Sequence, residues 1–186
     1  VRFTEDIPWN EDIGLTRSED VVLGYDHPVN EVLTCHVEAY RQRLLDLGVL
    51  DPRYSFAGGG GDGLLVNTWD DPVYYELMST GKATNTGLEL TIAHNFAKGY
   101  FYQVNGSVYD SQYDLNGVGS TSTRWNGNYR ANVMGGAEWS KVKEDRVRTW
   151  GVSGRLAVAG GLRYTPFTVE VRRPGLINIW YGAPWS

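Results

Sequence analysis

The sequence predicts an all-β fold, an antiparallel up-and-down meander of long strands. Three observations lead to this fold class. Apolar and polar side chains alternate over long stretches, short turns and longer loops follow one another in regular order, and Gly, Tyr and Trp are abundant, at 23, 12 and 7 of 186 residues. Because successive side chains of a strand point to opposite faces, each alternating stretch has one apolar and one polar side.

The first predicted hairpin covers residues 18–26 and 32–45. Apolar residues recur at every second position from Val21 in the first strand and from Leu33 in the second. The connection at 27–31 contains proline and asparagine, whose backbone preferences favour turns. We therefore expect two neighbouring strands joined by a short turn.

The central hairpin, at 84–95 and 99–113, has the clearest alternation, and its turn lies at 96–99. One side carries Leu88, Leu90, Ile92, Tyr100, Tyr102, Val104 and Val108. The other side carries Glu89, Thr91, Asn95, Gln103, Asn105 and Ser107. This pattern predicts a sheet in which one side meets an apolar environment and the other meets a polar one.

The third hairpin is predicted at 128–139 and 147–160, around a charged turn at 140–146. Its apolar positions again recur with a period of two, for example at Val152 in the second strand. A shorter seventh strand is predicted near 167–173. Beyond it the alternation is lost, and no further strand is expected.

The connections between the predicted strands alternate in length. Short turns are separated by long loops, which we expect at 46–81, at 114–127 and from 161 onward. Short periplasmic turns and long external loops are the rhythm of outer-membrane β-barrels. The strand at 128–139 also exceeds the length of about 5–6 residues usual in globular proteins, and approaches the roughly 9–11 residues that cross a bilayer at a tilt. Together these features predict a segment of a transmembrane β-barrel.

Aromatic residues gather beside the short turns, as expected for side chains at a membrane interface. The predicted interface aromatics are Tyr25, Tyr100, Tyr102, Trp139 and Trp150, with Phe96 beside them. A second belt is expected near the long loops, at Tyr40, Tyr109, Tyr113 and Tyr129. The charged residues Glu38, Glu89, Arg130 and Arg155 fall on the polar side. An unpaired Arg or Lys at the centre of the lipid would cost about 2–4 kcal/mol, so the lipid bilayer is the expected partner of the apolar side.

No stretch has the pattern of a catalytic, cofactor or metal site, and an enzyme is not expected. The lone Cys35 excludes a disulfide framework and any multi-cysteine metal site. His36 and Glu38 share a side, but no third ligand has a matching spacing. The segment GGGGDG at 58–63 lacks the Lys and Ser/Thr of a phosphate-binding loop, and no Gly-x-Ser-x-Gly elbow supports a hydrolase. The net charge of −5 opposes nucleic-acid binding, which needs a basic face.

The long loop at 46–81 holds the candidate ligand-binding residues. These are Trp69, Asp70, Asp71, Tyr74 and Tyr75. Their aromatic and acidic side chains could contact a ligand at the mouth of a pore, because long loops are often functional. They could equally be ordinary loop residues, and the sequence does not choose between the two interpretations.

Five short motifs occur in the order and spacing of one known family. They are Gly-Leu-Glu-Leu at 87–90, Gly-Tyr-Phe at 99–101, Gly-Ser-Val-Tyr-Asp-Ser at 106–111, Trp-Asn-Gly-Asn-Tyr at 125–129 and Gly-Gly-Ala-Glu at 135–138. With them, the chain from 18 to 167 resembles the C-terminal barrel of TonB-dependent outer-membrane receptors. It is most similar to the Bacteroidota group with a carboxypeptidase-regulatory-like domain and a plug. The segment GGLRYTP at 160–166 departs from the family pattern at Leu162.

The resemblance implies a barrel of about 22 strands that encloses a plug. It places the protein in the cell outer membrane of a Gram-negative bacterium, as part of the wall of an active transporter whose external loops capture a nutrient. Siderophores, peptides, glycans and vitamins all remain open as cargo. The TonB system of the inner membrane would act on the plug. Neither the plug nor the TonB box is found in the 186 residues, so we expect a partial barrel.

Two other hypotheses explain the same alternation. The first is a soluble or surface-displayed β-sandwich binding module, whose apolar side would be covered by a second sheet. The second is a small complete barrel of about eight strands, acting as an enzyme or an adhesin. It needs at least one more clear strand than the sequence shows.

Overall fold

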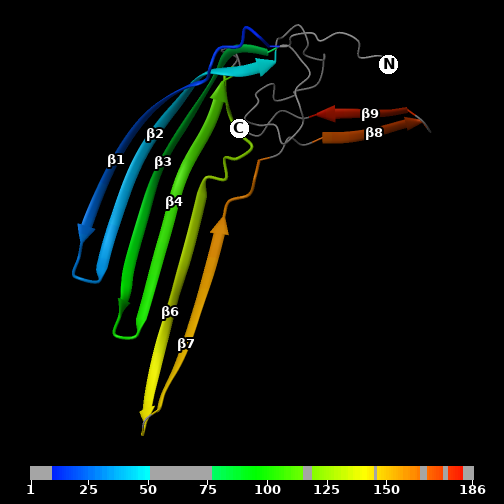
Figure 1. The fold of residues 1–186 in the computed structure, drawn as a ribbon. Helices are drawn as coiled ribbons and strands as arrows, with labels where there is room; N and C mark the ends of the chain where they lie inside the picture. The colour runs from blue at the N-terminus through cyan, green and yellow to red at the C-terminus, as the bar shows by residue number, and fades with distance from the viewer. Residues whose placement is uncertain are drawn as a thin grey trace.

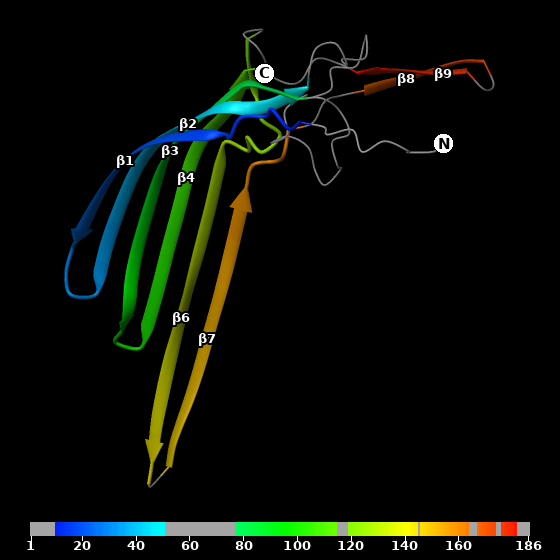
Figure 2. The ribbon, with the colours of Figure 1, turned by 45° about the horizontal axis from the view of Figure 1, so that its top comes forward.

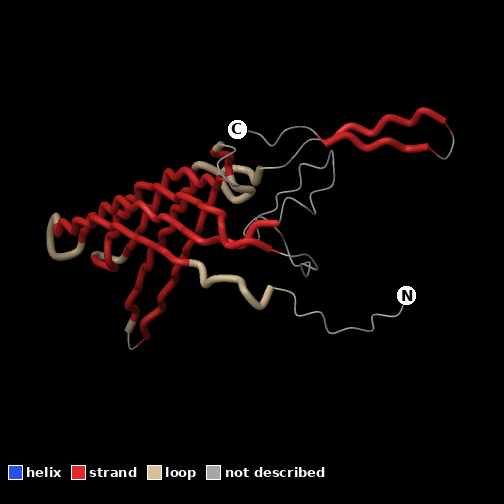
Figure 3. Tube along the Cα trace, turned by 90° about the horizontal axis from the view of Figure 1, so that it is seen from above, coloured by secondary structure: helices blue, strands red, loops and turns tan. Residues whose placement is uncertain are grey.

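A computed structural model describes residues 10–50, 77–114, 119–144, 146–163, 167–173 and 176–181. Its strands are β1 (Arg17–Pro28), β2 (Leu33–Leu50), β3 (Leu77–Ala97), β4 (Tyr100–Asp114), β5 (Ser120–Ser122), β6 (Tyr129–Lys143), β7 (Arg146–Ala159), β8 (Phe167–Arg173) and β9 (Leu176–Tyr181). The described residues contain strands and loops and no helix, as Figure 3 shows. The described part of the chain thus has no helix long and apolar enough to cross a membrane.

Six long strands lie side by side in one antiparallel sheet, in the order β1-β2-β3-β4-β6-β7, and the short β5 pairs with the end of β4. Figure 1 shows three long hairpins whose turns lie at one end of this sheet; β2 ends and β3 begins at the other end, which we call the long-loop end. The sheet is open, with β1 and β7 as its outer strands. Strands β8 and β9 form a separate two-stranded sheet. The predicted all-β, antiparallel up-and-down meander is confirmed.

All six predicted long strands are present, but the loop predicted at 46–81 is wrong in its extent. Strand β2 continues to Leu50 and β3 begins at Leu77. The register shifts between Leu44 and Gly48, and Asp46 has a φ of 58°, so a β-bulge interrupts the ladder there. A bulge also interrupts the alternation of side chains, and this hid the strand ends in the sequence.

Three further details of the prediction need correction. Strand β5 lies inside the loop predicted at 114–127. The sequence did not predict it, because three residues are too few to show alternation. Strand β9 lies where no strand was expected, whereas β8 covers the predicted 167–173. The charged turn predicted at 140–146 is shorter, because Lys143 pairs directly with Arg146. Charged residues broke the apolar pattern there without ending the strands.

The register places alternate residues of all six strands on two faces of the sheet. Leu88 of β3 pairs with Ala39 of β2 and with Val108 of β4, and Val108 pairs in turn with Tyr129 of β6. We call the side that carries these residues the apolar face, and the opposite side the polar face. The polar face carries the charged residues that the sequence assigned to it, Glu38, Glu89, Arg130 and Arg155.

Large side chains of the apolar face are exposed across the whole width of the sheet. Leu23 on β1 is 75% exposed, Leu88 on β3 is 48% exposed and Leu156 on β7 is 67% exposed. No described strand or loop covers these side chains. Contiguous apolar surfaces of this extent are rare on soluble monomers, and they mark surfaces that meet a partner or a membrane.

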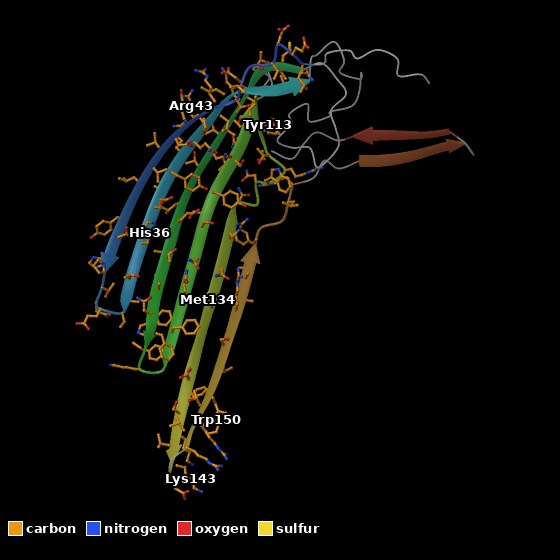
Figure 4. The ribbon with its side chains drawn as sticks, viewed as in Figure 1. His36, Arg43, Tyr113, Met134, Lys143 and Trp150 are labelled. Atoms are coloured by element: carbon orange, nitrogen blue, oxygen red, sulfur yellow. The ribbon has the colours of Figure 1, made fainter. Side chains whose placement is uncertain are left out.

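The buried core is small and lies at the long-loop end of β2, β3 and β4. It consists of Leu47, Val49, Ala83 and Tyr113, with Leu44 and Met78 packed against them. Figure 4 labels Tyr113 at this end of the sheet. Toward the short turns the described part of the sheet has no buried core, so its packing there depends on whatever meets its two faces.

Candidate functional site

The five predicted interface aromatics all lie on the apolar face, toward the short-turn end of their strands. We call them the aromatic row, and its members are Tyr25, Tyr100, Tyr102, Trp139 and Trp150. Trp139 and Trp150 are direct partners across β6 and β7. The rings of Tyr100 and Tyr102 stack on His94, with centroids 4.6 and 5.1 Å from the imidazole. The row therefore spans all three long hairpins.

The aromatic row crosses the strands at an angle. The residues in register with Tyr25 are Ala131 on β6 and Val158 on β7. Trp139 and Trp150 lie eight residues closer to the turn than these two residues. Eight residues span about 26 Å along a strand, and the five steps from β1 to β7 span about 24 Å. The row is thus inclined by about 45–50° to the line perpendicular to the strands.

A charge-free apolar band lies on the apolar face between the aromatic row and the long-loop end. On β6 it runs from Tyr129 to Trp139, which is 11 residues, and on β7 from Trp150 to Val158, which is nine. Charged residues occupy this face only beyond the two ends of the band. They include Glu19, Arg41, Arg43 and Asp110 toward the long loops, and Lys141, Lys143, Arg146 and Arg148 toward the short turn.

Hydrogen bonds between side chains cross the polar face from strand to strand. Arg155 Nε donates to Asn132 Oδ1 at 2.5 Å, and Asn132 Nδ2 donates to Asn105 Oδ1 at 3.3 Å. Asn105 Nδ2 continues the chain by donating to Thr91 Oγ1 at 2.9 Å. This chain of polar groups joins β7, β6, β4 and β3. Amide and guanidinium groups have more donors and acceptors than these bonds use, so the face suits contact with water or with another polar surface.

A pocket of about 360 Å³ opens on the polar face near the long-loop end. Its lining includes Tyr40, Gln42, Asn85, Tyr109, Ser111 and Trp125. Ser111 Oγ donates to Asn85 Oδ1 at 2.6 Å, and Asn85 Nδ2 donates to Gln42 Oε1 at 2.8 Å. Aromatic walls with a hydrogen-bonded amide floor can hold a small molecule that is partly apolar and partly polar.

A glycine makes room for one wall of this pocket. Gly87 lies between Tyr40 on β2 and Tyr109 on β4 in the register. A Cβ atom at Gly87 would come within 2.5 Å of the Tyr40 ring, so the ring lies over the place where a side chain would be. A side chain at this position would therefore displace Tyr40.

The second aromatic belt, predicted at Tyr40, Tyr109, Tyr113 and Tyr129, is wrong for three of its four members. Only Tyr129 lies on the apolar face. Tyr40 and Tyr109 lie on the polar face at the pocket, and Tyr113 belongs to the small core. The sequence grouped them by their distance from the loops. A shift of one residue along a strand moves a side chain to the other face, so that distance does not decide the side.

The segment 125–129 is held by a residue that follows β7. Arg163 Nε donates to the carbonyl of Asn126 at 3.0 Å, and Arg163 Nη2 donates to Asn128 Oδ1 at 2.5 Å. Asn126 is 1% exposed, and its Nδ2 donates to Asp110 Oδ1 at 2.7 Å. The motifs at 106–111 and 125–129, which both carry the family resemblance, are thus in contact through Asp110 and Asn126. Sequence reasoning gave these residues no role, and their only signal was membership of the two motifs.

Replacing Asn126 with leucine should lower the free energy of unfolding by about 1–3 kcal/mol, because the side chains of Asp110 and Asn128 lose a buried partner. The free energy of unfolding, followed by urea titration, measures the change. Asn95→Leu serves as a control in an exposed position, and should change stability by no more than about 0.5 kcal/mol. Equal effects of the two substitutions would show that the buried amide is dispensable.

The candidate ligand-binding residues Trp69, Asp70, Asp71, Tyr74 and Tyr75 lie outside the described residues, and so does the glycine-rich segment 58–63. His36 and Glu38 are described. His36 Nδ1 is 2.8 Å from Asp26 Oδ1, and His36 Nε2 is 3.6 Å from Glu38 Oε2. The carboxylates approach different nitrogens of the ring, so the three groups form an ion-paired cluster when the imidazole is protonated. No group of three or more His, Cys, Asp or Glu side chains within the described ranges could hold a metal ion.

No protein-family model, curated protein or solved structure matches the chain.

Proposed function

We propose that the chain forms part of the wall of a transmembrane β-barrel in the outer membrane of a Gram-negative bacterium, with its apolar face toward the lipid. The observation that carries the proposal is the exposed apolar band with its slanted aromatic row. The inclination of about 45–50° is close to the tilt of about 35–45° found for strands of membrane barrels. At such a tilt about 9–11 residues cross the bilayer, and the band on β6 and β7 has this length.

The distribution of charge on the apolar face supports the same orientation. The band itself contains no Asp, Glu, Lys or Arg on any of the six strands. Toward the long loops, Arg41 and Asp110 are the first charges beyond the band, and two residues farther out Arg43 Nη1 lies 3.2 Å from Glu19 Oε2 as an ion pair. An ion pair is inexpensive at the level of hydrated headgroups and costly in hydrocarbon, which agrees with a membrane boundary at this position.

The polar face would line the interior of the barrel. Its chain of hydrogen bonds from Arg155 to Thr91 suits a wet surface, and its pocket at the long-loop end would open toward the outside of the cell. The role of this face is to contact an internal plug and to offer a first binding surface to incoming cargo. The proposal assigns no covalent chemistry to any residue.

The finer proposal, a TonB-dependent nutrient transporter, rests on the motif resemblance. Under it, a plug fills the barrel and the TonB system of the inner membrane acts on that plug. Sequencing the gene upstream of the codon for Val1 tests this assignment. A plug domain and a TonB box there would support it, whereas an unrelated soluble domain would contradict it.

Vesicle flotation tests the membrane proposal directly. The 186-residue chain should move with zwitterionic phospholipid vesicles to the top of a density gradient, remain there after a urea wash and be released by detergent. An aggregate caused by the exposed apolar face pellets instead of floating, so the two are distinguished. Recovery of a soluble, monodisperse chain without detergent would contradict the proposal, and would favour a β-sandwich binding module with a covered apolar side.

A further inference from the structure

The β6–β7 hairpin continues past the aromatic row and carries four cations on the side of the apolar face. Lys141 is the direct partner of Arg148, and Lys143 is the direct partner of Arg146. Figure 4 labels Trp150 and Lys143 in the lower part of this hairpin, and Figure 2 shows that the hairpin reaches farther than the other two. All four side chains are exposed. We call them the basic tip.

The charge of the basic tip is not balanced by the described part of the chain. Like charges placed directly opposite each other in a sheet are destabilising, and here two such pairs follow one another. None of the four cations makes an ion pair with a described carboxylate. Glu144 lies in the turn with a φ of 53°, and the polar face of the tip carries only Ser140, Val142, Val147 and Thr149. An anion from outside the described chain would remove this repulsion.

The position of the basic tip indicates which anion that is. Lys141 and Arg148 each lie two residues beyond the Trp139–Trp150 pair, which is about 7 Å along the strand. Indole rings at a membrane interface lie at the level of the headgroups. Cations one step farther out are therefore at the level of lipid phosphates, and guanidinium groups bind phosphate through paired hydrogen bonds.

We propose that the basic tip is a binding site for the phosphate groups of anionic phospholipids in the leaflet at the short-turn end of the barrel. The inference rests on the proposed membrane insertion. It is local to one hairpin, because the turn between β3 and β4 contributes the single cation Lys98 and the turn between β1 and β2 contains Glu31. The basic tip would fix the depth and rotation of the β6–β7 hairpin relative to the lipid.

Partition of the whole chain into vesicles of two compositions tests the site. One set is zwitterionic phosphatidylcholine, and the other contains phosphatidylglycerol as well. A cation close to an anionic membrane contributes roughly five-fold to binding, so anionic lipid should raise the partition of the unaltered chain at 0.15 M salt. The double variant Lys141→Gln with Arg148→Gln should show an increase in partition on adding phosphatidylglycerol that is about 25-fold smaller. The gain should also fall steeply at about 1 M salt, where charges are screened.

A matched control removes two positive charges from the polar face, which the proposal turns away from lipid, by Arg130→Gln with Arg155→Gln. This variant should keep most of the gain from phosphatidylglycerol. Both variants should partition into phosphatidylcholine vesicles as the unaltered chain does, which shows that they fold and insert.

Equal loss of the gain in both variants, or no loss in the tip variant, would overturn the lipid site. Inorganic phosphate and chloride are also compared as competitors at equal ionic strength. If phosphate lowers the gain from phosphatidylglycerol more strongly than chloride does, the lipid site is overturned in favour of a free-phosphate site. Failure of the unaltered chain to enter phosphatidylcholine vesicles would instead overturn the proposed membrane function on which the site rests.

Discussion

Replacing Val104 with arginine should destabilise the membrane-inserted sheet by about 2–4 kcal/mol, whereas the same change at Asn105 should cost about 1 kcal/mol. Val104 lies in the middle of the apolar band on β4, between Ile92 of β3 and Val133 of β6. An arginine there would place its charge near the centre of the bilayer. Asn105 lies on the polar face, where arginine loses two hydrogen bonds but keeps its contact with water.

The free energy of unfolding in lipid vesicles, measured by urea titration, decides between these outcomes. Asn105 is a demanding control, because its side chain bonds both Thr91 and Asn132 whereas Val104 makes no side-chain hydrogen bond. A soluble sheet with a wet apolar face would rank the two substitutions in the opposite order. Equal cost at both positions would also contradict the assignment of the apolar face to lipid.

Leu156→Arg should cost about 2–4 kcal/mol in the membrane, whereas His27→Arg should cost about 0–1 kcal/mol, although the two residues lie in the same register row. His27 pairs with Cys35 of β2, and the row continues through the sheet to Leu156 of β7. The row is perpendicular to the strands, and the proposed membrane is inclined to it. On β1 the row therefore reaches the interface, while on β7 it runs through the apolar band.

The same vesicle assay measures this difference, and an assay in water provides its control. Leu156 is 67% exposed, so its replacement removes little packing within the chain and should be nearly neutral without lipid. Similar costs for Leu156→Arg and His27→Arg in vesicles would mean that the aromatic row does not follow the membrane boundary. The apolar band would then need another explanation.

The sequence predicted β4 and the part of β3 from Thr84 onward closely, because alternation is a local property of the chain, but it missed residues 77–83 of β3. Leu88, Leu90 and Val104 alternate with Glu89 and Asn105 whatever the rest of the protein does. The prediction failed where local geometry breaks the period. The bulge near Asp46 interrupts the alternation, so the end of β2 was not predicted. Cations occupy every second position at the ends of β6 and β7, so these strand ends were predicted as a charged turn.

The candidate site was predicted less completely than the fold. The aromatics of the row were identified from their nearness to short turns, and the structure places all five on one face. The pocket and the contact of Arg163 with Asn126 were not foreseen. They join residues that are tens of positions apart in the chain, and neither composition nor period carries information about such pairs.

The sequence by itself thus determined which residues alternate, and with that the two-sided character of each strand. Only the tertiary structure decided how the strands align with one another. That alignment turned separate aromatics into one inclined row, set Lys141 against Arg148 and placed Tyr40 and Tyr109 on either side of Gly87. The physical reason is that cross-strand register is fixed by pairing between distant segments, and a slip of one residue exchanges the two faces of a strand.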